Sequence, residues 1–385
     1  MRTALIAVAA ALTAAGPTTS APRGSAWTVA RARAVLAAHT FSVVDSTQPD
    51  RPEYDLVFTR SQARSLRSDG RRLVFAGRAH DLFADSDVEV RFVFDRPGRI
   101  VAFRGPAADM TQPSFPIRAT FYYAWYPEAW TRDGVFPYTK LRPSLSFYDA
   151  DDVTVVRMHT EALSYGHLDA GIYSWWGPSG YPPTDERFGR YLAVARTTPF
   201  RWAIYYEREG YEDPSVAKIR SDLEYVRDRY ASKPAYLKVD GRFVVFVYAD
   251  GADSCATAGR WAAANTVGAY VVLSGFGGWS ECAWQPQAWH QYSSDRAEYT
   301  FAPSSYMISP GFDEAKAPAP ALARNLDAWR RSIADMVASN APWQLVISFN
   351  EWAEGTAIES GSDWESPSGF GAYLDALHEA LPPRS

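Results

Sequence analysis

Two glutamates, Glu351 and Glu354, stand close together in the segment VISFNEWAEGTAIES, residues 346–360. The apolar residues before them predict a buried strand, and Gly355 permits a sharp turn after it. Carboxyl groups that converge near aromatic side chains resist ionising together, so the pKa of one of them should rise. The pair would then place a proton donor beside a proton acceptor, the minimum equipment for cleaving a glycosidic bond.

The local backbone decides whether these two carboxyl groups can meet. On an extended strand, residues an odd number apart point to opposite faces, which would separate Glu351 from Glu354. Across a turn, residues i and i+3 come together on one side. A shared site therefore requires the strand to end at about Glu351. The alternative is that one glutamate is a loop cap or a surface charge.

Aromatic and polar residues also follow the ends of other strand-like runs. Sugar rings present apolar C–H faces and hydroxyl edges, which suit flat aromatic side chains with polar groups beside them. The expected substrate-binding residues are Glu207, Tyr123, Trp125, Tyr126, Trp175, Trp176, Tyr206, Tyr248, Asn350 and Trp352. For any one aromatic residue the alternative is simple core packing, and for Glu207 it is a salt bridge to a neighbouring arginine.

The elements that must position these residues fill residues 109–385. Apolar strand-like runs alternate there with helical stretches, and an eighth strand is expected around TFAPSSYM, residues 300–307. Apolar strands joined by helices indicate a parallel sheet covered by helices. We therefore predict an α/β fold, a (β/α)8 TIM barrel, whose active site would lie at the C-terminal ends of the strands.

The N-terminal part of the chain has a different pattern. Residues 1–26 carry an early arginine, an apolar run and then small residues, the layout of a secretory signal peptide. Residues 27–108 read as a small α+β domain, followed by a linker rich in turn formers. No later apolar segment is long enough to span a bilayer. We expect a secreted, extracellular protein.

Charge, cysteines and motifs narrow the function further. A net charge of -5 without long runs of one sign does not favour nucleic acid as a partner. The two cysteines, Cys255 and Cys282, predict a disulfide in an oxidising compartment, with two separate buried thiols as the alternative. No zinc, serine-hydrolase, P-loop or dinucleotide motif occurs, so we expect neither a metal nor a cofactor. Arginine greatly outnumbers lysine, which suggests a GC-rich bacterial genome.

The segments that contain the candidate site residues resemble glycoside hydrolase family 99 and its relatives, the endo-α-1,2-mannosidase type. The resemblance extends from about Thr120 to Ser360 and is carried by the blocks FYYAWY, FYDADDVTVVRMHTEAL, GIYSWWGP, AIYYEREGYED, DLEYVRDRYASKPAYLKVDGRFVVFVY and SFNEWAEGTAIES. The last block is the most specific, because the pattern NEWxEGTxIE rarely occurs by chance. Ala353 stands where the family commonly has histidine.

The resemblance implies a barrel that cleaves internal α-mannosidic or similar linkages with retention and without a protein nucleophile. Glu351 would act as the general base toward the sugar 2-hydroxyl, which gives a 1,2-anhydro intermediate. Glu354 would act as acid and base on the leaving oxygen. Glu207 matches a family glutamate that lines the subsite of the cleaved sugar.

These observations predict a secreted glycoside hydrolase, an endo-acting, retaining α-glycosidase that degrades polysaccharide, with α-mannan as the first candidate. The expected partner is a polysaccharide or oligosaccharide, and we expect a monomer. The alternative, from another functional class, is a carbohydrate-binding barrel without catalysis. The presence of both Glu351 and Glu354 favours the enzyme.

Overall fold

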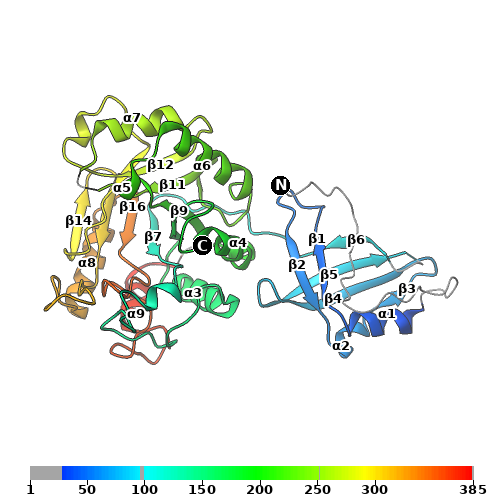
Figure 1. Ribbon diagram of the computed structural model, residues 1–385. Helices are drawn as coiled ribbons and strands as arrows, with labels where there is room; N and C mark the ends of the chain where they lie inside the picture. Colours follow the sequence, from blue (N-terminus) through cyan, green and yellow to red (C-terminus); the bar gives the residue numbers. More distant parts are fainter. Residues whose placement is uncertain (1–27, 96–98, 251, 384–385) are drawn as a thin grey trace. The chain divides into compact units, whose positions relative to one another are not determined.

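The computed structural model describes residues 28–95, 99–250 and 252–383. The chain divides into two compact units, Met1–Ala108 and Asp109–Ser385. Figure 1 shows the first in blue to cyan and the second mainly in green to red. Each unit has its own hydrophobic core. The predicted signal peptide, residues 1–26, lies outside the described residues.

The first unit is an antiparallel sheet with a helix packed on one face. Its elements are α1 (Val29–Leu36), β1 (Phe41–Val44), β2 (Glu53–Val57), α2 (Arg60–Ala63), β3 (Arg67–Ser68), β4 (Leu73–Asp81), β5 (Ser86–Phe94) and β6 (Ile100–Arg104). The strand order is β1-β2-β4-β5-β6, with β3 paired to β4. Apolar residues at alternate strand positions meet Ala32 and Leu36 of α1, and this contact forms the core.

The second unit is built on eight parallel strands. In chain order they are β7 (Ile117–Tyr122), β8 (Ala170–Trp175), β9 (Arg201–Tyr206), β11 (Arg242–Val247), β12 (Tyr270–Ser274), β13 (Ala288–His290), β15 (Ser305–Ile308) and β16 (Trp343–Val346). The hydrogen-bonded order is β13-β12-β11-β9-β8-β7-β16-β15-β14. No ladder joins β13 to β15, although their Cα atoms approach within 8 Å. The sheet is therefore a nearly closed barrel, and the predicted eighth strand is β15.

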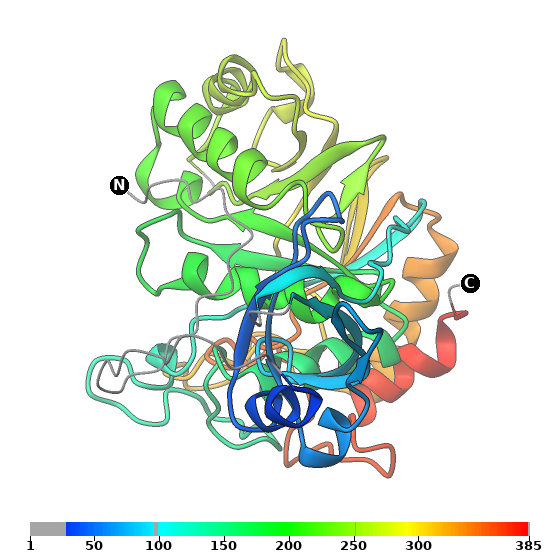
Figure 2. The ribbon, with the colours of Figure 1, turned by 90° about the vertical axis from the view of Figure 1, so that its right-hand side faces the viewer.

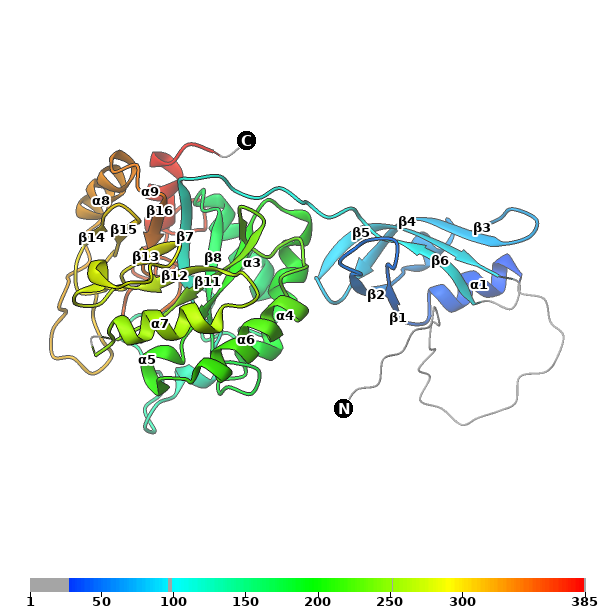
Figure 3. The ribbon, with the colours of Figure 1, turned by 90° about the horizontal axis from the view of Figure 1, so that it is seen from above.

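Helices cover this barrel incompletely. They are α3 (Val153–Tyr165), α4 (Thr184–Val194), α5 (Glu209–Glu212), α6 (Val216–Arg229), α7 (Cys255–Ala264), α8 (Leu326–Ala338) and α9 (Ala372–Ala380). Figure 2 shows α8, in orange, beside α9, in red, and Figure 3 shows α4, α6 and α7 outside the strands. The fully described connections after β12 and β13 hold no α-helix. One holds the 3-10 turn η3 (Trp279–Glu281), and the other holds strand β14 (Glu298–Phe301), antiparallel to β15. The prediction of a helix after every strand is wrong at these two connections.

Local sequence explains where several helices begin. Asp152, Ser215 and Asn325 precede α3, α6 and α8, and the side chain of each accepts a backbone N–H of the first turn. Such side chains satisfy N–H groups that have no partner within the helix. These caps mark the residues at which the three helices begin, after the C-terminal ends of the preceding strands.

The strand side chains form two buried layers. Alternate residues such as Phe121, Ala203 and Phe246 fill the barrel interior, in a cluster drawn from the strands and their flanking residues. The residues between them, such as Tyr122 and Ile204, belong to a second cluster that includes the helices. Because successive strand residues point to opposite faces, neighbours in sequence enter different layers. This alternation decides which residues can reach a site at the barrel mouth.

Candidate active site

The two paired glutamates lie on a turn that follows β16. The strand ends at Val346, and the segment then bends, with the Gly355 N–H donating to the carbonyl of Trp352 at 3.2 Å. Gly355 has φ +68°, a conformation that glycine adopts without strain. The Glu351 N–H donates to Ser348 Oγ at 2.8 Å. The chain thus turns between the two glutamates, as their convergence requires.

Glu351 is buried, with 3% of its surface exposed. Burial raises its pKa well above the ordinary value, and the charges of Glu354 and Glu207 raise it further. The backbone N–H groups of Ala353 and Glu354 hydrogen-bond its carboxylate and oppose this shift. Glu351 is therefore electrostatically linked to both other glutamates, so the three share one site.

Glu354 is partly buried on the same turn. Burial raises its pKa to about 7. The hydroxyl of Tyr292 donates to its Oε2 at 3.1 Å and lowers the pKa, whereas the charge of Glu314 raises it. A carboxyl group with a pKa near neutrality can both give and take a proton under physiological conditions.

Glu207 follows β9 and is 4% exposed. Burial raises its pKa to about 8, with a further increase from the charge of Glu354, while the hydroxyl of Ser174 opposes the shift. Within the described part of the chain, neither Oε1 of Glu207 nor Oε2 of Glu351 has a hydrogen-bond partner. Buried polar atoms seldom lack partners, so both carboxyl groups retain an oxygen that can still accept a hydrogen bond. The salt-bridge alternative for Glu207 is not seen.

Aromatic side chains surround these acids. Tyr123 stacks on Trp125 with ring centroids 4.5 Å apart. The pKa of Tyr123 lies well above its usual value, first because of burial and then because Tyr292 and all three glutamates lie close. On the side of Glu207, Trp176 and Tyr248 lie 5.1 and 5.6 Å from the ring of Tyr211, which is 64% exposed. The mouth of the barrel thus combines carboxyl groups with aromatic faces.

Four predicted substrate-binding aromatics lie outside this mouth. Trp175 and Tyr206 belong to the outer layer, where they donate to Asp185 and Asp222 at 2.8 Å. Tyr126 stacks on Trp130 at 3.9 Å, and Trp352 donates to a buried carboxylate, that of Glu359, described below. None of the four is more than 1% exposed. The structure thus places these four predicted binding residues in the outer layer, apart from the three glutamates.

Asn350 is also fully buried, and its side chain is used within the protein. Its Oδ1 accepts the backbone N–H of Tyr123, and its Nδ2 donates to the carbonyl of Tyr123, both at 2.8 Å. It therefore joins the segment that carries the paired glutamates to the end of β7. Of the predicted binding residues, Glu207, Tyr123, Trp125, Trp176 and Tyr248 remain at the mouth.

Three further tyrosines at the mouth, Tyr292, Tyr205 and Tyr211, are not among the predicted binding residues. Tyr292 contacts Glu354 and lies two positions beyond His290, on the same face of the β13 run. Tyr205 points inward, and its hydroxyl lies 3.3 Å from Nε2 of His290. Tyr205 lies two positions before Glu207, so the period-two alternation counted back from that glutamate could have placed it on the same face. Nothing in the local pattern marks the exposed Tyr211.

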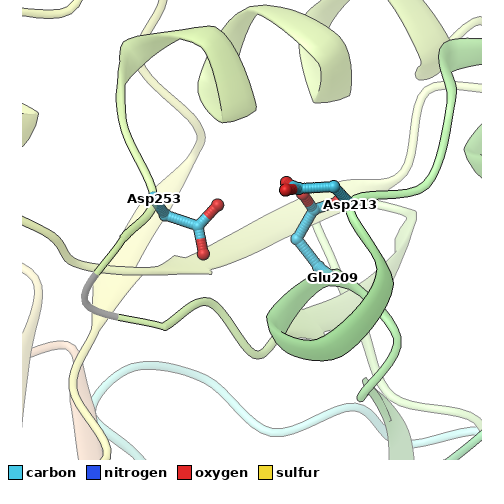
Figure 4. Close-up of side chains that lie close together, drawn as sticks. All are labelled: Glu209, Asp213 and Asp253. Atoms are coloured by element: carbon cyan, nitrogen blue, oxygen red, sulfur yellow. The ribbon is translucent and has the colours of Figure 1, made fainter.

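A second group of acids lies beside the mouth. Figure 4 shows Glu209, Asp213 and Asp253 pointing toward one another, and one carboxylate oxygen of each lies within 4.8 Å of the others. Arg260 donates to Glu209 and Asp213, and Trp261 Nε1 donates to Glu209 at 2.7 Å. The arginine already supplies a positive charge to this cluster, so its carboxylates are explained without a metal ion.

A disulfide joins Cys255, at the start of α7, to Cys282, directly after η3. The predicted pairing is confirmed, and the alternative of two separate thiols is wrong. The bond ties the connection after β11 to the connection after β12. No helix among the described residues has the length and apolar character required to cross a membrane.

Comparison with known proteins shows the fold of the larger unit. No family model matches the chain, and no curated protein matches its sequence significantly. Two solved structures of the GH99 endo-alpha-mannosidase from Bacteroides thetaiotaomicron, one of them with bis-tris-propane, are similar, each at 18% sequence identity. The matches cover 69% of this chain and 96% or 97% of theirs, with TM-scores of 0.55 and 0.54. The chain therefore resembles these mannosidases in fold over nearly their whole length.

Proposed function

We propose that the protein is a secreted, retaining endo-α-glycosidase that hydrolyses α-linked polysaccharide, with α-mannan as the first candidate. One observation carries the proposal: Glu351 and Glu354 lie on a single turn at the mouth of the barrel, and their carboxyl groups interact. The aromatic faces around them suit sugar rings. The fold resemblance to GH99 endo-alpha-mannosidases supports α-mannan.

In the first step, Glu351 accepts one proton and Glu354 donates another. Glu351 removes the proton of the 2-hydroxyl of the bound sugar, and the freed oxygen attacks C1. The bond from C1 to the leaving oxygen breaks, and Glu354 gives its proton to that oxygen. The product is a 1,2-anhydro sugar, with both acids now in the opposite protonation state.

The second step restores the enzyme. Glu354 takes a proton from water, whose oxygen attacks C1, while the bond between C1 and the 2-oxygen breaks. Glu351 returns its proton to the 2-oxygen. Two inversions at C1 give net retention, and no protein nucleophile or cofactor is needed.

The electrostatics of the turn support the acid role of Glu354. Below about pH 7, Glu354 holds a proton and can act as the acid. A protonated Glu354 no longer repels a charge on Glu351, and the N–H groups of Ala353 and Glu354 favour that charge. Burial acts in the opposite direction and holds the pKa of Glu351 well above its ordinary value, so the base role of Glu351 rests on the position of its carboxyl group on the turn and not on this shift. This arrangement differs from the opposed carboxyl groups of most glycosidases.

Export to an oxidising compartment is part of the same proposal. The layout of residues 1–26 supports it, and so does the Cys255–Cys282 disulfide, because such bonds persist mainly outside the cytosol. A monomer suffices for the reaction, since all the acids come from one chain.

The test is to incubate the protein with α-mannans and α-glucans and to follow product length and anomeric configuration by NMR at early time. Oligosaccharides released with retained configuration are expected. Glu351→Gln and Glu354→Gln should each reduce turnover by ~10²–10⁴-fold without lowering Tm, since glutamine has no charge to bury. Glu365→Gln, at an exposed position of the same unit, is the matched control. Near-normal turnover in the first two variants would remove the mechanism, and binding without hydrolysis would indicate a carbohydrate-binding barrel.

A further inference from the structure

A buried polar network lies behind the catalytic turn, on its outer side. The indole of Trp352 points away from the barrel interior, and its Nε1 donates to Oε2 of Glu359 at 2.9 Å. The hydroxyl of Tyr148 donates to the same oxygen at 2.7 Å. The other oxygen of Glu359 lies 3.1 Å from Nε2 of His159, on α3. Glu359 and His159 are 3% and 1% exposed, so water does not compensate either group.

The direction of the hydrogen bonds can be followed from the far end. The hydroxyl of Tyr191 donates to the carbonyl of Ala150 at 2.8 Å, which uses its only proton. The hydroxyl of Tyr122, 3.1 Å from that of Tyr191, must therefore be the donor to it. Nδ1 of His159 lies 2.7 Å from the Tyr122 hydroxyl, whose proton is already used, so Nδ1 carries a proton and donates it.

This series of hydrogen bonds leaves one proton to be shared between Nε2 of His159 and the carboxyl group of Glu359. With Nδ1 of His159 protonated, the contact between Nε2 and Glu359 is a hydrogen bond only if one of the two atoms carries a proton. Whichever atom carries it, the pair has no net charge, as burial demands.

We propose that Glu359 and His159 are positioning residues, which act through Trp352 to fix the turn that carries Glu351 and Glu354. The proposal rests on the proposed function. Trp352 is the residue from which the turn departs, and its carbonyl also accepts a hydrogen bond from Thr139 Oγ1 at 2.9 Å.

The link to the acids runs through the backbone. The N–H groups of Ala353 and Glu354, directly after Trp352, face the carboxylate of Glu351. Any rotation at Trp352 moves these donors and changes the approach of Glu354 to Glu351. His159, on α3, and Glu359, on the catalytic segment, thus hold the acid and the base in their relative positions.

Kinetics with matched tryptophan variants form the first test. Trp352→Phe removes the N–H that binds Glu359 while keeping an aromatic ring. We expect kcat to fall by roughly 10–100-fold with KM nearly unchanged, since misplacement of a catalytic group by about 1 Å has effects of this order. Glu359→Gln should act in the same way, and the double variant should be no worse than the stronger single one. The control is Trp329→Phe, in α8. The indole of Trp329 is also buried, and its Nε1 donates to the carbonyl of Tyr373 at 3.0 Å.

A second measurement does not depend on turnover. The carboxyl of Glu354 can be titrated by ¹³C NMR in protein labelled at glutamate, with Glu354→Gln to assign the signal. The proposal predicts that Trp352→Phe and His159→Gln move the midpoint of this titration and that Trp329→Phe does not. An unmoved midpoint, together with an unchanged kcat, would overturn the positioning role. If no glycan is hydrolysed by the unaltered protein, the proposed function fails, while a moved midpoint still supports the network.

Discussion

At the scale of single residues, Glu207 couples the candidate site to stability. Its folded-state pKa of about 8 exceeds the value of about 4.3 for an unfolded chain, so the folded protein binds a proton more tightly. The stability from this proton is fully present below about pH 4.3 and is lost as the pH rises toward 8. At neutral pH the side chain therefore opposes folding, as expected of a group retained for binding.

The prediction is that Glu207→Gln stabilises the protein near pH 8 and leaves it unchanged near pH 4. Glutamine has no charge to bury, and the expected gain at pH 7 is on the order of 3 kcal/mol. Urea unfolding at pH 4, 7 and 8 measures it, and the exposed Glu365→Gln should show no change at any of these pH values. A Glu207→Gln protein that is less stable at pH 8 would mean that Glu207 is ionised and compensated in the folded state.

Alternation limits what sequence can predict about single residues. In the run WAIYYE, Tyr205 points into the barrel and Tyr206 points out to Asp222. Both faces of such a strand are buried, so its composition does not mark which face is the interior. Glu351 and Glu354 stand out in the sequence because two carboxyl groups, three residues apart, follow an apolar run. The position of Trp352 between them gave no sign that its ring lies in the outer layer.

At the scale of elements, the turn that carries Glu351 and Glu354 is held against the connection that follows β15. The N–H of Asp313 donates to the carbonyl of Glu354, and the N–H of Ala315 donates to that of Ala353, both at 2.8 Å. A Cβ on Gly355 would meet the carbonyl oxygen of Asp313 at 2.8 Å. Gly355 is therefore required for its space as well as for its positive φ.

The prediction is that Gly355→Ala costs more stability than Gly241→Ala and also lowers kcat. Gly241 has a similar φ of +72°, but no atom lies within 4 Å of the added Cβ, so its substitution shows the backbone cost alone. That cost is roughly 1–2 kcal/mol. Gly355→Ala adds the displacement of Asp313 from Glu354. Thermal unfolding and kcat, measured on both variants, separate the two effects, and equal behaviour would show that the connection yields freely.

The barrel strands were predictable because apolar runs of strand length recur between helical stretches. The helix after every strand was not, because the segment after β12 contains turn formers that allow only η3, and the segment after β13 pairs back as β14. Antiparallel pairing of β14 with β15 depends on contacts distant from the local pattern. The location of the turn after β16 likewise depends on Asp313, which no local signal connects with Glu354.

At the scale of the whole molecule, the two units have cores that share no residue. Phe92, fully buried, packs in the first core against Phe103, with ring centroids 4.9 Å apart. Phe246, also fully buried, packs inside the barrel against Trp343 at 5.0 Å. Large apolar side chains contribute to the stability of the core that they fill, so these two residues report on separate folding units.

The last prediction is that each of the two units unfolds in its own transition. Phe92→Ala should lower the free energy of unfolding of the first unit by roughly 3–5 kcal/mol, and with it the temperature of one calorimetric transition. Phe246→Ala should have an effect of similar size on the second unit and on the other transition. Differential scanning calorimetry of the full chain with either substitution measures both shifts. Hydrolysis of glycan, where detected, should persist in Phe92→Ala up to the barrel transition, because every acid of the site lies beyond residue 109. If both transitions moved together in either variant, the units would unfold as one.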